Sequence, residues 1–94
     1  MALSLDAVIS RNEISFLTNP VGDEIIILNM ETGDYLGLNK VGSSIWEHLK
    51  MPQSVGEIIE KLVAEFDVDK GTCTTETIEY LEKIQLLGLL QSEV

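Results

Sequence analysis

The chain has 94 residues, of which 45% are hydrophobic, and a net charge of −10. This length suits one domain, residues 1–94, with a modest core, and the apolar fraction favours a folded chain over a disordered one. Much of this charge lies in residues 51–94, which carry nine acidic side chains and three lysines. Because a negative surface repels phosphate backbones, we expect no nucleic-acid partner and favour a partner with basic groups.

The sequence also indicates where the protein works. It holds one cysteine, which excludes an internal disulfide and is compatible with a reducing compartment. No run approaches the length of a membrane span, and the N-terminus has neither a basic region nor a long apolar core. We therefore expect a cytoplasmic protein with no membrane partner.

The first part of the chain is predicted to form strands separated by turns. Ala7–Ser10 and Ile14–Leu17 are short runs of β-prone residues, and Thr18–Asp23 is dense in turn formers. Glu24–Met30 is the clearest strand, because three consecutive isoleucines suit a pleated surface that is covered on both faces. One face would meet the helices, and the other would need a further cover or a partner.

A β-hairpin is predicted where this strand ends. Glu31–Asp34 forms the turn, in which Gly33 can adopt a positive φ without a steric penalty, and Tyr35–Leu38 is the returning strand. A strand that ends a small meander is expected to lie at an edge of its sheet. Such an edge offers unpaired N–H and C=O groups, and Gly37 lets another backbone come close.

The helical half begins at Asn39, whose side chain can cap the first helical turn. This first helix ends before Pro52, which blocks its continuation. Ser54 and Glu57 then have the spacing of a capping box at the start of a second helix. The second helix is expected to face the core with a continuous apolar stripe formed by Val55, Ile58, Ile59, Leu62, Val63 and Phe66.

A third helix is expected over residues 72–87, between a cap at Asp69 and a break at Gly88. After the break, Leu89 and Leu90 are expected to fold back onto the core. The main apolar stripe of the third helix consists of Thr77, Tyr80, Leu81, Ile84 and Leu87.

A second row on the third helix is displaced from this stripe and has two interpretations. Ile78, Glu82 and Leu86 either widen the core face or form the half-exposed wall of a groove. Glu76, Glu79 and Glu82 likewise form either a solvated face or an acidic rim for a peptide that carries lysine or arginine. The sequence leaves both pairs of alternatives open.

Motifs that carry catalysis or bind cofactors do not occur in the chain. His48 is the only histidine, and no cysteine lies near it in the sequence, so a structural or solvent-facing role is favoured over a metal site. Cys73 is expected to be a small, partly buried residue. There is no glycine-rich phosphate loop, paired-cysteine zinc pattern or nucleophile elbow. We therefore expect no metal, no cofactor and no enzymatic activity.

The order of these motifs resembles the coenzyme PQQ synthesis protein D (PqqD) family, over roughly residues 8–90. Within that family the chain looks most like the stand-alone leader-binding proteins of lasso-peptide gene clusters, which are called RiPP recognition elements. Three short strands are followed by Glu-Thr-Gly-Asp-Tyr-Leu-Gly-Leu-Asn at 31–39, Gly-Ser-Ser-Ile-Trp at 42–46, Ser-Val-Gly-Glu-Ile-Ile at 54–59, Tyr-Leu at 80–81 and Gly-Leu-Leu at 88–90.

This resemblance implies an α+β, winged helix-turn-helix-like fold, with a three-stranded antiparallel sheet followed by three helices. It also implies a non-catalytic adaptor that binds the leader segment of a ribosomally made precursor peptide and presents it to a processing enzyme. The leader would add as a strand to the third strand and pack against the third helix. The peptide-binding residues implied in this sequence are Asp34, Tyr35, Leu36, Gly37, Leu38, Ile78, Glu79, Glu82 and Leu86.

Partners and alternatives follow from the same resemblance and from the charge. In a lasso pathway the partners would be a separate leader peptidase and a cyclase that acts after cleavage. A second interpretation is a partner of a radical-SAM enzyme in PQQ-like cofactor synthesis. A winged-helix DNA-binding regulator is disfavoured by the acidic third helix. A small dimerisation module, with Ile78 and Leu86 at a homodimer interface, is the fourth.

Overall fold

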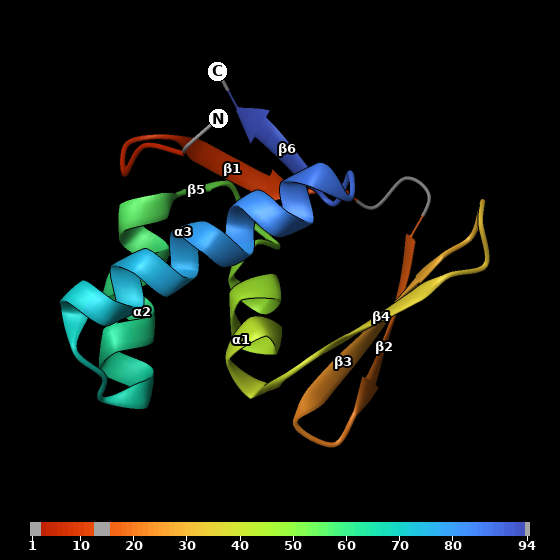
Figure 1. The fold of residues 1–94 in the computed structure, drawn as a ribbon, viewed down its shortest axis with the longest axis horizontal. Coiled ribbons are helices and arrows are strands. Elements are labelled where there is room, and N and C mark those ends of the chain that lie inside the picture. The colour runs from red at the N-terminus through yellow and green to blue at the C-terminus, as the bar shows by residue number, and fades with distance from the viewer. Residues whose placement is uncertain (1–2, 13–15, 94) are drawn as a thin grey trace.

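Within residues 3–12 and 16–93, which the computed structural model describes, the chain forms two small antiparallel sheets and three helices (Figure 1). The predicted fold class, an α+β fold with a three-stranded antiparallel sheet followed by three helices, is confirmed. In chain order the elements are β1 (Val8–Arg11), β2 (Phe16–Val21), β3 (Glu24–Asn29), β4 (Tyr35–Leu38), α1 (Lys40–His48), β5 (Gln53–Ser54), α2 (Val55–Phe66), α3 (Lys70–Leu86) and β6 (Leu90–Glu93).

The three-stranded sheet has the order β2-β3-β4, so β4 lies at an edge as predicted. Gly33 has a φ of 80° in the β3–β4 turn, which is the conformation that favours glycine there. Ser43 in α1 fixes the other end of this hairpin. Its hydroxyl accepts from the N–H of Ile25 at 3.0 Å and donates to the carbonyl of Leu38 at 3.1 Å, so it connects two residues that face each other across β3 and β4.

Strand β2 differs from the prediction at both ends. The predicted strand began at residue 14, and residues 14 and 15 lie outside the described part of the chain. At the other end β2 continues through Thr18–Val21, which was predicted as part of a turn, and only the Gly22-Asp23 pair turns the chain. Proline is tolerated in β2 because β2 is an edge strand, and the positive φ of Gly22, 65°, permits the tight turn.

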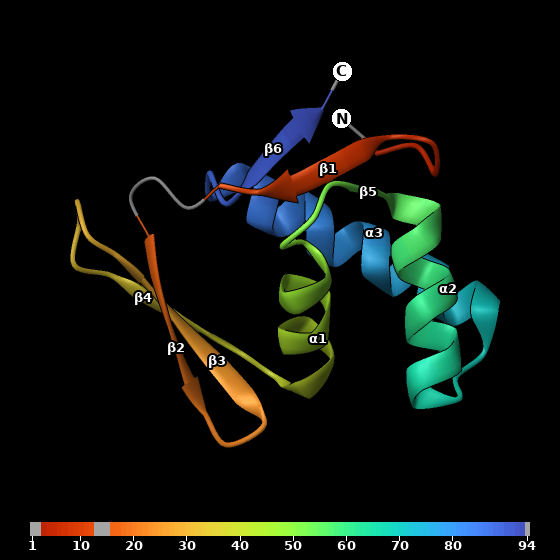
Figure 2. The same ribbon diagram turned by 180° about the vertical axis from the view of Figure 1, so that it is seen from behind.

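A second sheet, with the order β5-β1-β6, was not predicted. The β-prone run at the N-terminus does form a strand, β1, but it pairs with β5 and β6 rather than with its neighbours along the chain. Leu89 is buried, as expected for a chain that folds back onto the core, and the residues directly after it form strand β6. Figures 1 and 2 show β1, β5 and β6 together beside the ends of α1 and α2, apart from the other sheet.

The helix caps agree with the predictions. Asn39 Oδ1 accepts from the N–H of Gly42 at 2.8 Å, and Asp69 Oδ2 accepts from the N–H of Thr72 at 2.9 Å. At α2 both hydrogen bonds of the capping box are present, because the Ser54 N–H donates to Glu57 Oε1 and the Glu57 N–H donates to Ser54 Oγ. These local contacts satisfy N–H groups that have no partner within their own helix.

The capping box predicts a specific pH dependence of stability. Hydrogen bonds from Ser54, first from its backbone and then from its side chain, lower the pKa of Glu57 below the ordinary value of 4.5. A lowered pKa in the folded state stabilises the fold above the unfolded-state pKa, and this stabilisation is lost as the pH falls through the folded-state pKa.

We therefore expect the wild type to lose more stability than Glu57→Gln as the pH falls from about 5 to about 3. Urea denaturation of the two proteins across this range measures the difference. Glutamine can keep the hydrogen bond without titrating. Parallel losses of stability in the two proteins would show that the pKa of Glu57 is not linked to folding.

The core lies between the helices and the inner faces of the sheets. Trp46 is completely buried in it, with the Arg11 guanidinium 5.1 Å from the ring centroid. Arg11 also donates to the Trp46 carbonyl at 3.2 Å, so it joins β1 to α1. Leu87, predicted to face inward, is exposed because α3 ends at Leu86. The other buried apolar residues are Ile9, Ile25, Ile27, Leu38, Ile45, Leu49, Val55, Ile58, Ile59, Leu62, Cys73, Leu81, Ile84 and Leu89.

The arrangement of the elements determines which surfaces stay open. The sheet β2-β3-β4 stands to one side of α1, and β4 runs directly into the N-terminus of that helix (Figures 1 and 2). Helix α3 crosses α1 on one side of the molecule and also packs against α2. Across the described residues, no helix has the length and apolarity that crossing a bilayer requires.

Candidate functional site

The free edge of β4 can be assigned from the hydrogen bonds of its hairpin. The Asn29 N–H donates to the Asp34 carbonyl at 2.8 Å, which makes these two residues a hydrogen-bonded pair. Such pairs alternate along an antiparallel ladder. Leu36 is therefore in a bonded pair with β3, whereas Tyr35 and Gly37 direct their N–H and C=O groups away from β3 and toward the open edge.

The side chains of β4 alternate between two environments. Leu38 is buried and Leu36 is half-buried, and both pack on the core side of the sheet. Tyr35 is 76% exposed on the opposite face. Gly37 shares that face, has no positive φ, and leaves open space where a Cβ would lie. No contact within the chain requires glycine at this position, which is consistent with the close approach of a second molecule.

A hollow of about 480 Å³ opens beside the end of β4. It lies between the start of α1, the end of α2 and the first half of α3, and Asn39, which directly follows β4, is part of its wall. Most of its lining is apolar, with Val41, Phe66 and Val68 among the residues that face it. A cavity with this lining suits an apolar side chain of a ligand.

Tyr80 forms the part of this wall that comes from the middle of α3. A Cβ on Gly42 would lie 2.9 Å from the Tyr80 Oη, so the absence of a side chain at position 42 lets the ring lie against α1. The Tyr80 Oη is buried and has no hydrogen-bond partner among the described residues. Burial raises the pKa of Tyr80, so the phenol stays neutral.

The two flanks of α3 are not equivalent with respect to β4. Glu76 and Tyr80 both line the hollow beside α1. An α-helix turns about 100° per residue, so the side chains of two residues that are two positions apart point about 160° away from each other. Ile78 lies two positions from both Glu76 and Tyr80, and Glu82 lies two positions from Tyr80. Ile78 and Glu82 therefore project from the flank of α3 that faces away from the hollow.

The residues proposed from the sequence thus separate into two groups. Positions 34–38 are contiguous along the hairpin, with Asp34 exposed in the turn. In the other group Ile78 is half-buried against the core and Glu82 is half-buried, whereas Glu79 is exposed. Leu86 is 90% exposed at the end of α3, on the side opposite the buried Thr77. Asn39, which follows β4, shares the lining of the hollow with Tyr80, whereas none of the residues proposed on α3 lines it.

Several residues of the hollow were not proposed as site residues from the sequence. Tyr80 was assigned to the core stripe, and Glu76 was considered only as part of an acidic row. The available signal was the combination of a glycine inside α1 with a large aromatic residue in α3, since a small residue permits close helix packing. This combination cannot be recognised from a fixed spacing in the sequence, because the two residues lie in helices that are far apart along the chain.

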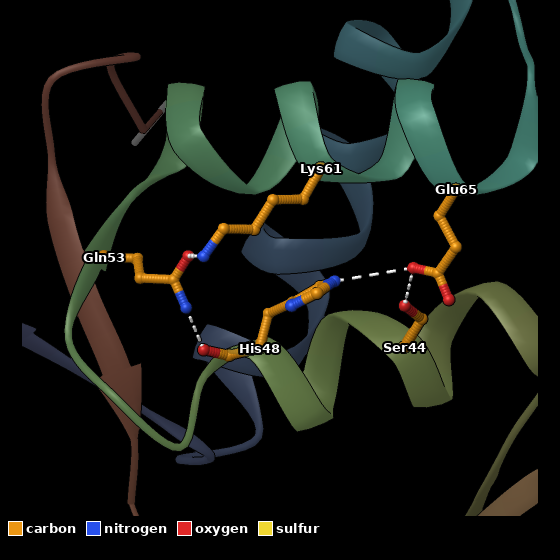
Figure 3. A network of polar contacts seen from close by, with 5 residues as sticks. All are labelled: Ser44, His48, Gln53, Lys61 and Glu65. Atoms are coloured by element: carbon orange, nitrogen blue, oxygen red, sulfur yellow. Dashed lines mark hydrogen bonds and ion pairs between the residues drawn. The ribbon is translucent and has the colours of Figure 1, made fainter.

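His48 and Cys73 both make polar contacts within the fold. Figure 3 shows His48 in a polar network that joins α1, α2 and β5. The His48 Nε2 lies 3.5 Å from Glu65 Oε1, which also accepts from the Ser44 hydroxyl at 2.5 Å. The carbonyl of His48 accepts from Gln53. The Cys73 thiol is buried, 3.7 Å from the hydroxyl of Thr77 on the same helix. Among the described residues, no group of histidine, cysteine and acidic side chains could hold a metal ion.

Comparison with known proteins identifies the family to which this chain belongs. The family model for coenzyme PQQ synthesis protein D (PqqD) matches residues 24–90, and the chain therefore belongs to the PqqD family. A solved structure described as "TbiB1 in Complex with the TbiA(beta) Leader Peptide" is similar to this chain, with a TM-score of 0.79 and 28% sequence identity. The match covers 90% of this chain and 98% of that chain. A comparison with curated proteins found no match.

Proposed function

We propose that this protein is a non-catalytic adaptor that binds the leader segment of a ribosomally synthesised precursor peptide. The observation that carries the proposal is the open edge of β4, where Tyr35 and Gly37 present backbone groups that β3 does not pair, together with the apolar hollow that begins at Asn39, directly after the strand. The likeness to TbiB1, whose structure holds a leader peptide, supports the same class of ligand.

The leader would bind as an additional strand of the sheet. Its main chain would pair with the N–H and C=O groups of Tyr35 and Gly37, and an apolar side chain would enter the hollow beside Tyr80. In such β-augmentation, main-chain hydrogen bonds provide affinity and side-chain pockets provide selectivity. The acidic surface around the site would favour a leader with basic residues.

We propose lasso-peptide maturation as the pathway, because the order of sequence motifs resembles the stand-alone leader-binding proteins of that pathway. The adaptor would work in the cytoplasm and deliver the leader to a separate leader peptidase, and a cyclase would act after cleavage. The protein itself would need no metal or cofactor, since binding requires only the edge of β4 and its neighbouring wall.

A fluorescence-polarisation titration with a labelled leader peptide, taken from a precursor encoded beside this protein, tests the proposal. We expect saturable binding that unlabelled leader competes away. Absence of binding at high micromolar protein concentration would contradict the adaptor function. Size-exclusion chromatography with light scattering on the same sample would then show whether the open edge serves a homodimer instead.

Two charge reversals on α3 distinguish the two candidate walls of the site. Glu76 lies on the flank that lines the hollow, and Glu82 projects from the other flank. For a basic leader we expect Glu76→Lys to weaken binding by about two- to fivefold, with a smaller effect at high salt. Glu82→Lys serves as the matched control on the same helix, and polarisation titrations at two salt concentrations measure both.

A larger effect of Glu82→Lys would instead support the wall predicted from the sequence, with Ile78, Glu79 and Leu86 beside the leader. A loss of binding that does not change with salt would indicate a packing effect rather than a charge effect.

A further inference from the structure

The sheet β2-β3-β4 has a second face, which points away from the helices. The register places Leu28 opposite both Leu17 and Tyr35, so these three side chains form one row across the sheet. Leu17 is 55% exposed, and Val21 on the same strand and face is 53% exposed. Neither view of the fold shows a described helix or strand on this side of the sheet (Figures 1 and 2). We call Leu17, Val21, Ile26, Leu28 and Tyr35 the outer face.

The outer face has a consistent charge pattern around it. Asp23 and Glu24 lie at one end, in and beside the β2–β3 turn, and Glu31 and Asp34 lie at the other end, around the β3–β4 turn. Residues 16–38, which include all three strands, contain no lysine, arginine or histidine. The surface therefore consists of a largely apolar centre, which also contains Asn19, between two acidic ends.

The composition of the outer face differs from that of an ordinary solvated sheet face. Antiparallel sheets that leave one face in water usually alternate apolar residues on the core side with polar residues on the solvent side. Here leucine, valine, isoleucine and tyrosine occupy most of the solvent side, and Asn19 and Glu24 are its polar residues. Gly37 adds a position without a side chain next to Ile26, and its Cβ site is open. A contiguous apolar patch with a polar rim is typical of a protein-binding surface.

The charge pattern selects among possible partners. If two copies of this chain met through their outer faces, either relative direction would bring an acidic end of one copy onto an acidic end of the other. Like charges placed together in an interface oppose association. A partner that covers the apolar centre and offers lysine or arginine to both ends avoids this repulsion and gains electrostatic steering.

We propose that the outer face is the docking surface for the leader peptidase, through a matching patch that is apolar at its centre and basic at its rim. This inference rests on the proposed leader-binding function. The open edge of β4 and the outer face belong to the same three-stranded sheet, so a peptidase docked there lies beside the bound leader without covering its binding edge.

The test measures peptidase binding and leader binding separately. The variant combines Leu17→Thr with Val21→Thr, which removes apolar area from β2 and keeps residues that favour strands. The control is Met51→Gln, which changes a 68% exposed apolar residue outside the sheet. Bio-layer interferometry with the purified leader peptidase encoded with this protein gives one affinity, and fluorescence polarisation with the labelled leader gives the other.

We expect the double variant to bind the peptidase at least about tenfold more weakly and the leader within about twofold of wild type, whereas Met51→Gln changes neither affinity. Unchanged peptidase affinity in the double variant, or no peptidase binding by the wild type, would overturn the docking surface. A wild-type dimer that the double variant dissociates, seen by light scattering, would assign the face to a second copy. Failure of the wild type to bind leader would instead contradict the proposed function.

Discussion

Replacing Gly37 by proline is expected to weaken leader binding by at least about tenfold while the helices stay folded. The N–H of Gly37 points to the open edge of β4, so proline removes a donor that the added strand would use, and its ring blocks the approach of that strand. The fold should tolerate the change, because this N–H makes no bond within the β3–β4 ladder and the Cβ site is open.

Gly37→Ala is the matched control, because it adds a Cβ and keeps the N–H. We expect its leader affinity to fall much less than that of the proline variant in the polarisation titration. Circular dichroism of both variants checks that the helices remain. If the proline variant is folded and still binds with wild-type affinity, the leader does not pair with the edge of β4.

Replacing Trp46 by alanine is expected to lower the free energy of unfolding by about 3–5 kcal/mol. The side chain is completely buried, and the Arg11 guanidinium lies over its ring, so truncation leaves a large cavity and removes a contact between α1 and β1. Because domains of this kind have total stabilities of about 5–15 kcal/mol, a substantial fraction of the variant could be unfolded at equilibrium.

Trp46→Phe separates lost volume from lost polar contact. The indole Nε1 has no hydrogen-bond partner among the described residues, so phenylalanine keeps most of the packing and sacrifices no bond. We expect it to be much less destabilising than alanine. Urea denaturation followed by circular dichroism measures both variants, since Trp46 is the only tryptophan and its fluorescence is lost with it. A loss below about 1 kcal/mol in the alanine variant would show that the site collapses and fills the space.

The two proposed surfaces belong to a single small sheet. In β4 the backbone of Tyr35 and Gly37 faces the open edge, whereas the side chain of Tyr35 belongs to the outer face. A leader at the edge and a peptidase on the outer face would therefore be neighbours. This arrangement would let the adaptor hold the substrate next to its enzyme, and the separate variants proposed for the two surfaces would affect one binding event each.

The sequence by itself determined the parts of the structure that depend on neighbouring residues. The caps at Asn39, Ser54 and Asp69, the hairpin turn at Gly33 and the break at Gly88 were all predicted, because each depends on a side-chain oxygen or a positive φ within a few residues. The edge position of β4 was also predicted, since a strand that ends a meander has a single partner within it.

Only the tertiary structure decided how distant segments meet. The pairing of β1 with β5 and β6 joins the two ends of the chain, and strand propensity does not specify a partner. The sequence also indicated two rows of side chains on α3, the main apolar stripe and the displaced row, but it did not show which of them lies on the side of β4. The close packing of Tyr80 on Gly42 shows which side of α3 faces α1, because a helix can rotate about its own axis until its largest side chain meets a position that has none.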